Sequence, residues 1–136
     1  MRLIEREGRI GRWRWRWLHR RGVDYGSWGE WIALGHLLAE GFDVVARRWR
    51  CRAGELDLVA YDGDELVFVE VKTRRTPTAF APEVAVGAVK QARLELLADL
   101  FRARYELFDG PARFDLIAIE TPDLRHYKLR HYEGVF

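Results

Sequence analysis

An α/β domain with a mixed β-sheet is the fold class that the sequence predicts. Two helical segments alternate with five strand-like segments in the order α-β-β-β-α-β-β, which is typical of a sheet flanked by helices. The 136 residues suit one domain that buries a continuous core. No stretch rich in glycine, serine and proline divides residues 27–136, so we expect this part to fold as one domain.

Local signals predict the individual elements. Ser27-Trp28-Gly29-Glu30 has the S-x-x-E spacing of a capping box, which predicts a helix from Ser27 to Glu40 that stops at Gly41. A loop with Pro77 and Pro82 leads to a second helix, expected over about 83–104. Its apolar face would consist of Ala85, Val89, Ala92, Leu96 and Leu100. Strands are expected at residues 42–49, 54–61, 65–73, 113–120 and 127–132.

Composition narrows the class of protein. Cys51 is the single cysteine, so the chain forms no internal disulfide and no thiolate zinc site by itself. A lone cysteine is typical of the reducing cytoplasm. The sequence has neither an apolar run of about 20 residues nor the apolar core of a signal peptide. We therefore expect a cytoplasmic protein that does not enter a membrane.

Charge is unevenly distributed along the chain. The net charge is +2, but residues 1–21 carry eight arginines against Glu5 and Glu7, which gives +6 there and −4 over the rest. Residues 1–26 show no clean periodicity and are interpreted as a basic N-terminal arm. In an extended form its alternating residues would give an aromatic face and a cationic face, able to stack on bases and neutralise phosphates. These residues are Arg12, Trp13, Arg14, Trp15, Arg16 and Trp17. A mobile arm without a dedicated partner and a segment on a membrane surface remain alternatives.

Charged residues interrupt an apolar strand near Glu70 and Lys72. Side chains alternate across a strand, so these two residues share a face with Phe68, and Glu55 and Asp57 share a face of the preceding strand. A two-residue loop at Asp62-Gly63 would pair Asp57 with Phe68, whereas a four-residue loop from Asp62 to Glu65 would pair it with Glu70. Either register brings Asp57, Glu70 and Lys72 together, with Glu55 beside them.

Acids this close repel one another unless a cation lies between them. Mg²⁺, or Mn²⁺ in its place, prefers such hard oxygen ligands and fills its remaining positions with water and phosphate. A lysine beside the ion can orient water or stabilise charge on a phosphate, which suits phosphodiester hydrolysis. The alternative is structural: cross-strand salt bridges from Asp57 or Glu55 to Lys72 and Arg74.

Three further polar residues have two interpretations each. Glu30 lies on the helix face expected to meet the sheet, where it is either a further metal ligand or only the last residue of the capping box. Gln91 lies at the edge of the second helix's apolar stripe, where a polar residue is usually solvated. Asp115 competes with Asp57 for the catalytic role, but no acid-x-Lys strand follows it. We therefore expect Asp115 to form a structural ion pair with an arginine.

Read together, these motifs resemble the YraN family of bacterial proteins over about residues 26–136. They are Gly29-Glu30, Gly54-Glu55-Leu56-Asp57, Val67-Phe68-Val69-Glu70-Val71-Lys72-Thr73-Arg74, Lys90-Gln91, Arg113-Phe114-Asp115-Leu116 and the ending His131-Tyr-Glu-Gly-Val-Phe136. That family is in turn similar to the PD-(D/E)xK nucleases, which include Holliday-junction resolvases. The resemblance implies a restriction-endonuclease-like fold.

The resemblance also implies roles for single residues. Asp57 and Glu70 take the positions of the two metal-binding acids, and Lys72 takes that of the catalytic lysine. Glu30 corresponds to the acid on the first helix and Gln91 to the polar helix residue that some members use. Leu56 stands where the motif has proline, which removes no ligand.

The leading functional hypothesis is a Mg²⁺- or Mn²⁺-dependent endonuclease that acts on branched or otherwise structured DNA. Metal ligands would be Asp57, Glu70, Glu30 and Glu55. Nucleic-acid contacts would come from Arg47, Arg48, Arg50, Arg52, Arg74, Arg75 and Lys90. The alternative is a nucleic-acid-binding module without catalysis. A protein–protein scaffold built on the surplus tryptophans is a third hypothesis, and the sequence leaves a homodimer open.

Overall fold

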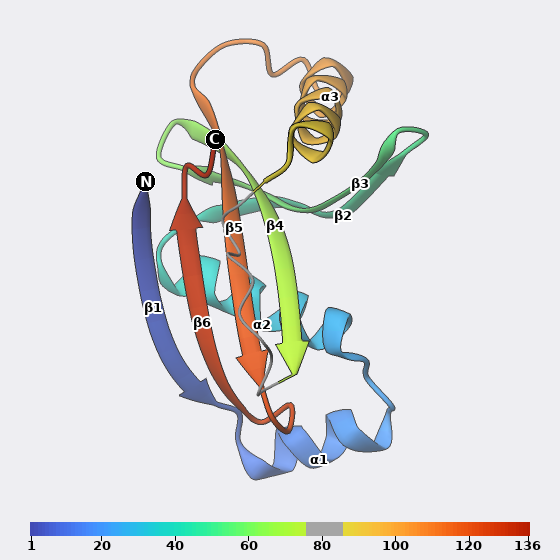
Figure 1. The fold of residues 1–136 in the computed structure, drawn as a ribbon, viewed down its shortest axis with the longest axis vertical. Helices are drawn as coiled ribbons and strands as arrows, with labels where there is room; N and C mark the ends of the chain where they lie inside the picture. Colours follow the sequence, from blue (N-terminus) through green and yellow to red (C-terminus); the bar gives the residue numbers. More distant parts are fainter. Residues whose placement is uncertain (76–85) are drawn as a thin grey trace.

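A computed structural model describes residues 1–75 and 86–136, and Figure 1 shows the resulting fold. Over these residues the chain forms a six-stranded sheet and three helices. The elements are β1 (Arg2–Arg9), α1 (Arg12–Arg20), α2 (Tyr25–Ala39), β2 (Asp43–Cys51), β3 (Gly54–Asp62), β4 (Glu65–Arg75), α3 (Ala88–Arg104), β5 (Ala112–Thr121) and β6 (His126–Glu133). The α/β class is confirmed, and the expected element order holds from α2 to β6.

The sheet is mixed, as the sequence predicts. Its strand order is β1-β6-β5-β4-β3-β2, and β4 pairs with β5 in parallel while every other pair is antiparallel. A parallel pair needs a long connection, and the chain between β4 and β5 contains α3. Figure 1 shows α2 on one face of the sheet and α3 on the other.

The strand β4 joins two apolar cores. Val67 and Val69 lie in the core that α2 covers, whereas Leu66 and Phe68 lie in the core that α3 covers. This is the alternation expected of a strand buried on both faces. It carries Glu70 and Lys72, which follow in the same alternation, toward the α3 side of the sheet.

The helix α2 begins earlier than the capping box predicts. Asp24 is the N-cap residue, and its side chain accepts a hydrogen bond of 2.7 Å from the backbone N–H of Ser27. The capping-box assignment is therefore wrong: Asp24 satisfies the free N–H of the first turn, and Ser27 already lies inside the helix. Glu30 lies one turn beyond Ser27 and has no capping role.

The helix α3 differs from the expected helix in its start and in its buried face. It begins at Ala88 behind the N-cap Gly87, while the expected start, including Ala85, and the loop prolines lie outside the described residues. Its buried residues are Leu97, Ala98 and Phe101. The predicted apolar face is wrong, because Val89, Leu96 and Leu100 are exposed.

The N-terminal residues form regular structure that the sequence analysis did not predict. β1 pairs with β6 along its whole length as an edge strand of the sheet. Residues 12–20 are helical, so the extended form considered for the Arg/Trp repeat is wrong. Ile10 is buried in the α2 core, and Trp15 and Leu18 pack against the same core, which fixes α1 beside it.

Candidate metal and phosphate site

The hairpin β3–β4 separates at the point where its charged residues begin. The pairs run from Asp62↔Glu65 to Leu58↔Val69, which is the register that the longer loop predicted. Beyond Leu58 the ladder stops, and the Asp57 carboxylate accepts a hydrogen bond of 2.9 Å from the backbone N–H of Val71. From there β3 continues only along β2 and β4 only along β5. The wedge between the two strands leaves room for polar side chains.

Three carboxylates meet beside this wedge, and we call them the acid cluster: Glu30, Glu55 and Asp57. Each offers one oxygen, and these oxygens all lie within 4.8 Å of one another. They come from two elements, Glu30 from α2 and the other two from β3. The early start of α2 helps to explain the arrangement, since it frees Glu30 from the helix terminus.

Asp57 is the member of the acid cluster whose negative charge is opposed by its surroundings. Burial raises the pKa of its carboxyl to about 6, the N–H of Val71 acts in the opposite direction, and the nearby charges of Glu30, Glu70 and Glu55 raise it further. A carboxylate in this position is stabilised by any cation that enters the cluster.

The other two acids have cationic partners. Arg48 Nε lies 2.5 Å from a Glu30 oxygen, and Arg50 Nε lies 3.2 Å from a Glu55 oxygen. Arg48 also donates to the hydroxyl of Ser27 and has a φ of 48°, in the left-handed region that is uncommon for residues other than glycine. A metal ion in the cluster would compete with these two arginines.

Glu70 and the two lysines form the second half of the site. The Glu70 carboxylate lies 2.6 Å from Lys90 Nζ on α3, and it is near enough to Asp57 to raise that pKa. Lys72 lies beside Lys90, and burial together with that neighbouring ammonium lowers the pKa of Lys72. Among residues 1–75 and 86–136 no carboxylate lies within ion-pair distance of Lys72.

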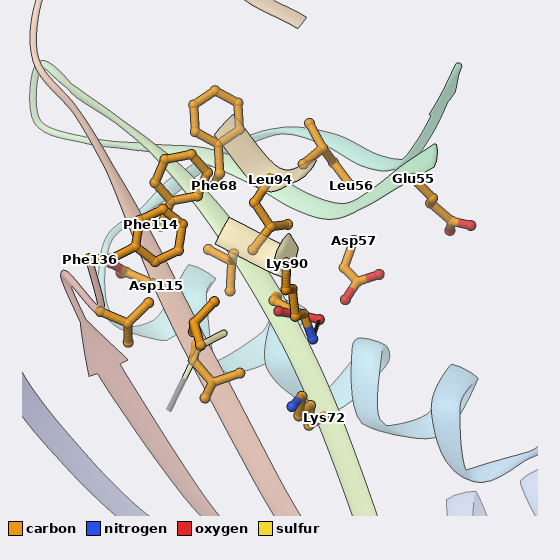
Figure 2. Close-up of a pocket in the computed structure, with 15 residues that line it drawn as sticks. Glu55, Leu56, Asp57, Phe68, Lys72, Lys90, Leu94, Phe114, Asp115 and Phe136 are labelled. Carbon is orange, nitrogen blue, oxygen red and sulfur yellow. Dashed lines mark ion pairs between the residues drawn. The ribbon is translucent and has the colours of Figure 1, made fainter. Parts of the chain in front are cut away.

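The site lies in a pocket between the sheet and the start of α3. Figure 2 shows Asp57, Lys72 and Lys90 projecting from three different elements at this pocket, with an apolar wall beside them. The wall contains Leu56, Phe68, Leu94, Phe114 and Phe136. Such a wall excludes water and strengthens the electrostatic interactions at the polar edge.

The predicted arginines of the site lie in three different places. Arg47 lines a hollow together with Glu30 and Arg48, whereas Arg52 lies toward the other end of α3. Arg74 and Arg75 continue β4 beyond Lys72, and Arg74 contributes to the lowered pKa of that lysine.

Gln91 and Asp115 both have partners outside the acid cluster. Gln91 donates a hydrogen bond of 3.2 Å to Glu95 on its own helix, so α3 presents Lys90 to the site instead. Asp115 is paired with Arg113 at 2.9 Å, which confirms the structural ion pair expected for it. It also accepts from His131 at 2.7 Å, and His131 in turn contacts the buried His36. Asp115, His131 and His36 thus form a buried network that links β5, β6 and α2.

A divalent ion fits the donor set of the acid cluster. Opposite ligands of an octahedral Mg²⁺ are about 4.2 Å apart, twice the metal–oxygen distance. The three oxygens of the cluster lie within 4.8 Å of one another, so small side-chain rotations would bring them to one ion. Oxygen-only donors are also what Mg²⁺ and Mn²⁺ prefer.

Two contributors to this region have only weak signals in the sequence. Lys90 was expected at the nucleic acid and not in an ion pair with Glu70, because helical spacing alone does not tell which neighbour turns toward the sheet. Trp31 was not singled out, yet it lines the hollow with Glu30 and Arg48. Its position directly after Glu30 was the available signal.

Within the part of the chain that the structure describes, no helix is both long and apolar enough to cross a membrane.

Comparisons with known proteins agree on one family. The model of UPF0102, described as an uncharacterised protein family, matches residues 29–119, which contain every residue of the acid cluster together with Glu70 and both lysines. A UPF0102 protein of Streptomyces griseus is 45% identical over 114 residues, covering 81% of this chain and 93% of the relative. One of Frankia casuarinae is 42% identical over 112 residues, covering 82% and 94%. A third, of Geotalea uraniireducens, is 40% identical over 111 residues, covering 82% and 87%.

These matches cover the part of the chain for which the sequence motifs predict a family relationship. The chain therefore belongs to UPF0102, the family expected above under the name YraN.

Proposed function

We propose that this protein is a metal-dependent endonuclease that hydrolyses phosphodiester bonds in branched or otherwise structured DNA. Mg²⁺ or Mn²⁺ would be held by Asp57 with Glu30 and Glu55, and Glu70 would join as a ligand if Lys90 turns to the phosphate. The bound ion would supply charge neutralisation at the scissile phosphate and a more acidic water. A nucleic-acid substrate agrees with the cytoplasmic location expected from the sequence.

One observation carries the proposal: two neighbouring lysines line the pocket that also holds Glu55 and Asp57 of the acid cluster. Lys72 and Lys90 are neighbours, and only Lys90 has a carboxylate partner among the described residues. Two adjacent ammonium groups repel each other, and both have donors to offer. A phosphate between them relieves the repulsion and places its phosphorus beside the acids.

The residues of the pocket would have separate roles in hydrolysis. Lys72 and Lys90 donate hydrogen bonds to the non-bridging phosphate oxygens, where negative charge increases in the transition state. The Val71 N–H holds the Asp57 carboxylate in place, where it would bind the ion that supplies the more acidic water. The apolar wall keeps other water molecules away from the phosphorus.

The similarity to the PD-(D/E)xK nucleases supports the same reaction, since Asp57, Glu70 and Lys72 occupy that motif's positions. Arginines near the cluster favour backbone contacts: Arg47 and Arg48 from β2 and Arg74 and Arg75 from the end of β4. No base-reading element is evident in the sequence, which favours recognition of DNA shape.

The test is cleavage of a labelled four-way junction and a flapped duplex with Mg²⁺. The wild type should cut at least one of them, and EDTA should stop it. Asp57→Ala and Lys72→Ala should each lower the rate by about a hundredfold or more, which corresponds to losing one strong transition-state contact. Asp64→Ala, a change of an exposed acid in the β3–β4 turn, is the matched control and should cut normally.

Calorimetric titration with Mn²⁺ separates metal binding from catalysis. Binding should be lost in Asp57→Ala and weakened in Glu30→Ala, and it should survive in Lys72→Ala. Cleavage that persists in both Asp57→Ala and Lys72→Ala would come from a contaminating nuclease, and the proposal would then be abandoned.

A second candidate function is a nucleic-acid-binding module without catalysis. The ion pairs of Glu30 with Arg48, Glu55 with Arg50 and Glu70 with Lys90 favour it, because they neutralise three of the four acids without a metal. This module would bind the junction in a salt-dependent way and would neither bind Mn²⁺ nor cut.

A further inference from the structure

The helix α1 exposes two tryptophans that the core does not use. Trp13 is 83% exposed and Trp17 is 56% exposed, and they lie one turn apart on the outer side of the helix. Trp15 and Leu18 point the other way, where the indole N–H of Trp15 donates 2.8 Å to the carbonyl of Asp123. The inner face thus packs α1 against the core, and the outer face remains exposed to solvent.

Arginines surround the exposed tryptophans. Residues 9–21 contain six arginines and no acid: Arg9, Arg12, Arg14, Arg16, Arg20 and Arg21. Within the described residues none of the six is ion-paired, although Arg16 lies over the Trp13 ring and Arg21 over the Trp17 ring, at 5.9 and 4.9 Å. The outer face of α1 therefore combines flat aromatic surfaces with uncompensated positive charge, which complements an anionic partner.

Trp31 connects this face with the acid cluster. It lines one hollow with Glu30 and Arg48, and a second hollow with Arg9 and Arg14. The guanidinium of Arg14 lies 5.4 Å from the centre of the Trp31 ring. A continuous row of aromatic and arginine side chains thus runs from Glu30 over Trp31 to α1.

We propose that Trp31 and α1 form a track for an unpaired strand of the nucleic-acid substrate. The proposal rests on the function proposed above and specifies its substrate: a duplex with a single-stranded segment, such as a flap or an open fork. Unpaired bases would stack on Trp13, Trp17 and Trp31 while the arginines neutralise the phosphates between them. Stacking of bases on aromatic side chains beside a cationic groove is the general mode of single-strand binding.

Nucleic acid fits this face better than a membrane surface does. An interfacial helix buries a broad apolar stripe of several residues in the lipid. On α1 the apolar residues Trp15 and Leu18 are already committed to the protein core, and only two separated indoles remain outside. Two indoles ringed by guanidinium groups match individual bases and phosphates.

The test measures binding alone, in EDTA, so that cleavage does not enter. Labelled 20-nucleotide oligo-dT and oligo-rU and a blunt duplex are titrated with the full-length protein by fluorescence anisotropy. Trp13→Ala/Trp17→Ala should bind both oligonucleotides about tenfold or more weakly, from the loss of two stacked bases, and the duplex almost as well as wild type. Arg12→Gln/Arg16→Gln/Arg20→Gln should reduce the slope of log affinity against log salt by about 2.

Two control variants separate this inference from the nuclease proposal. Phe108→Ala removes an exposed aromatic side chain from the loop after α3, at the other end of the molecule from α1 in Figure 1, and should bind like wild type. Asp64→Ala, in the exposed β3–β4 turn, should also bind like wild type. Oligonucleotide binding by the wild type, together with no cleavage by the wild type in Mg²⁺, would reject the nuclease and keep the strand-binding face.

Two results would overturn the inference. One is equal oligonucleotide affinity of wild type and Trp13→Ala/Trp17→Ala, with circular dichroism showing the same thermal unfolding for both. The other is binding of anionic phosphatidylserine vesicles through the same two tryptophans without binding of either oligonucleotide, which would assign this face to a membrane surface.

Discussion

Asp57 is a carboxyl group whose surroundings oppose its negative charge. Burial and three neighbouring acids oppose its charge, and only the N–H of Val71 favours it. The folded-state pKa of about 6 lies above the ordinary 3.8, so the folded protein binds the proton more tightly than the unfolded chain does. The ionised form therefore lowers stability, and this loss develops as the pH rises from about 4 to about 6.

Asp57→Asn should consequently stabilise the metal-free protein above pH 7. The amide oxygen can still accept from Val71, and the repulsion is gone. We expect a gain of about 1–2 kcal/mol at pH 8, after discounting for partial exposure, which shrinks to nothing near pH 4. Urea unfolding at pH 8, 6 and 4 measures it.

The matched control is Asp64→Asn, in the exposed turn, which should leave the stability profile of the wild type unchanged. A loss of stability at pH 8 in Asp57→Asn would contradict the claim that the ionised Asp57 carboxylate destabilises the folded protein. The buried His36 changes the free energy of unfolding with pH in the opposite direction, in the wild type and in both variants. Burial, then His131 and Arg6, lower the pKa of His36 to about 4. Its contribution to stability falls as the pH drops from 6.5 to 4.

At the scale of elements, the close packing of α2 on β4 positions Glu30. Gly29 is buried, and a methyl group at this position would collide with the side chain of Thr73 on β4. The absence of a side chain lets the helix approach the strand and brings Glu30 toward Glu55 and Asp57. Among the described residues the buried Thr73 hydroxyl has no hydrogen-bond partner.

Gly29→Ala should destabilise the protein although alanine is the better helix former. We expect a loss of about 1–3 kcal/mol from overpacking, partly offset by about 1 kcal/mol of helix propensity. Gly35→Ala on the same helix has open space around it and should stabilise by up to about 1 kcal/mol. Thermal unfolding of both variants gives the comparison.

A double-mutant cycle identifies the contact. In a Thr73→Ala background, which removes the nearest colliding atom, Gly29→Ala should lose less stability. Equal losses in both backgrounds would mean that Thr73 is not the obstacle.

At the scale of the whole molecule, the N-terminal segment belongs to the fold and also exposes two tryptophans among arginines. β1 completes one edge of the sheet, and Ile10 is only 6% exposed in the core that α2 covers. Trp15 and Leu18 add to that core from α1. A deletion of this segment therefore removes structural support together with the arginines, so single side-chain replacements are the proper probe of binding.

Deletion of residues 1–22 should lower the free energy of unfolding by about 3–6 kcal/mol, the contribution of burying two or three large apolar side chains. The midpoint of guanidinium unfolding measures the change, and hydrogen exchange should show faster exchange in β6, which loses its neighbour. The variant Trp13→Ala/Trp17→Ala, which keeps β1 and the inner face of α1, should unfold like wild type. An unchanged midpoint after deletion would show that the segment docks only loosely.

Comparison of sequence and structure shows where local patterns are informative. In β4 the alternation of Val67 and Val69 with Leu66 and Phe68 identified both buried faces, because each position meets a packed layer. α3 carries apolar residues on two sides, and spacing alone selected Val89, Leu96 and Leu100, which are exposed. The residues that the sheet buries are Leu97, Ala98 and Phe101. Helical periodicity indicates that a helix has apolar faces, but it does not show which of these faces packs against the sheet.

The N-terminal elements were missed for a similar reason. Tryptophan and arginine alternate with period two, which looks like a strand, yet the period-three pair Trp15 and Leu18 is the one that packs. β1 is an edge strand with few buried side chains, so its apolar pattern is weak.

The sequence by itself determined the α/β class, the central hairpin and the gathering of Asp57, Glu70 and Lys72 near one end of it, because strand parity and turn length are local properties. Only the tertiary structure decided that Glu30 comes within reach of Glu55 and Asp57, that Lys90 reaches Glu70, and that α1 lies against the core with two tryptophans outside. These depend on how α2, α3 and β1 dock on the sheet, and docking is set by contacts between residues far apart in the chain.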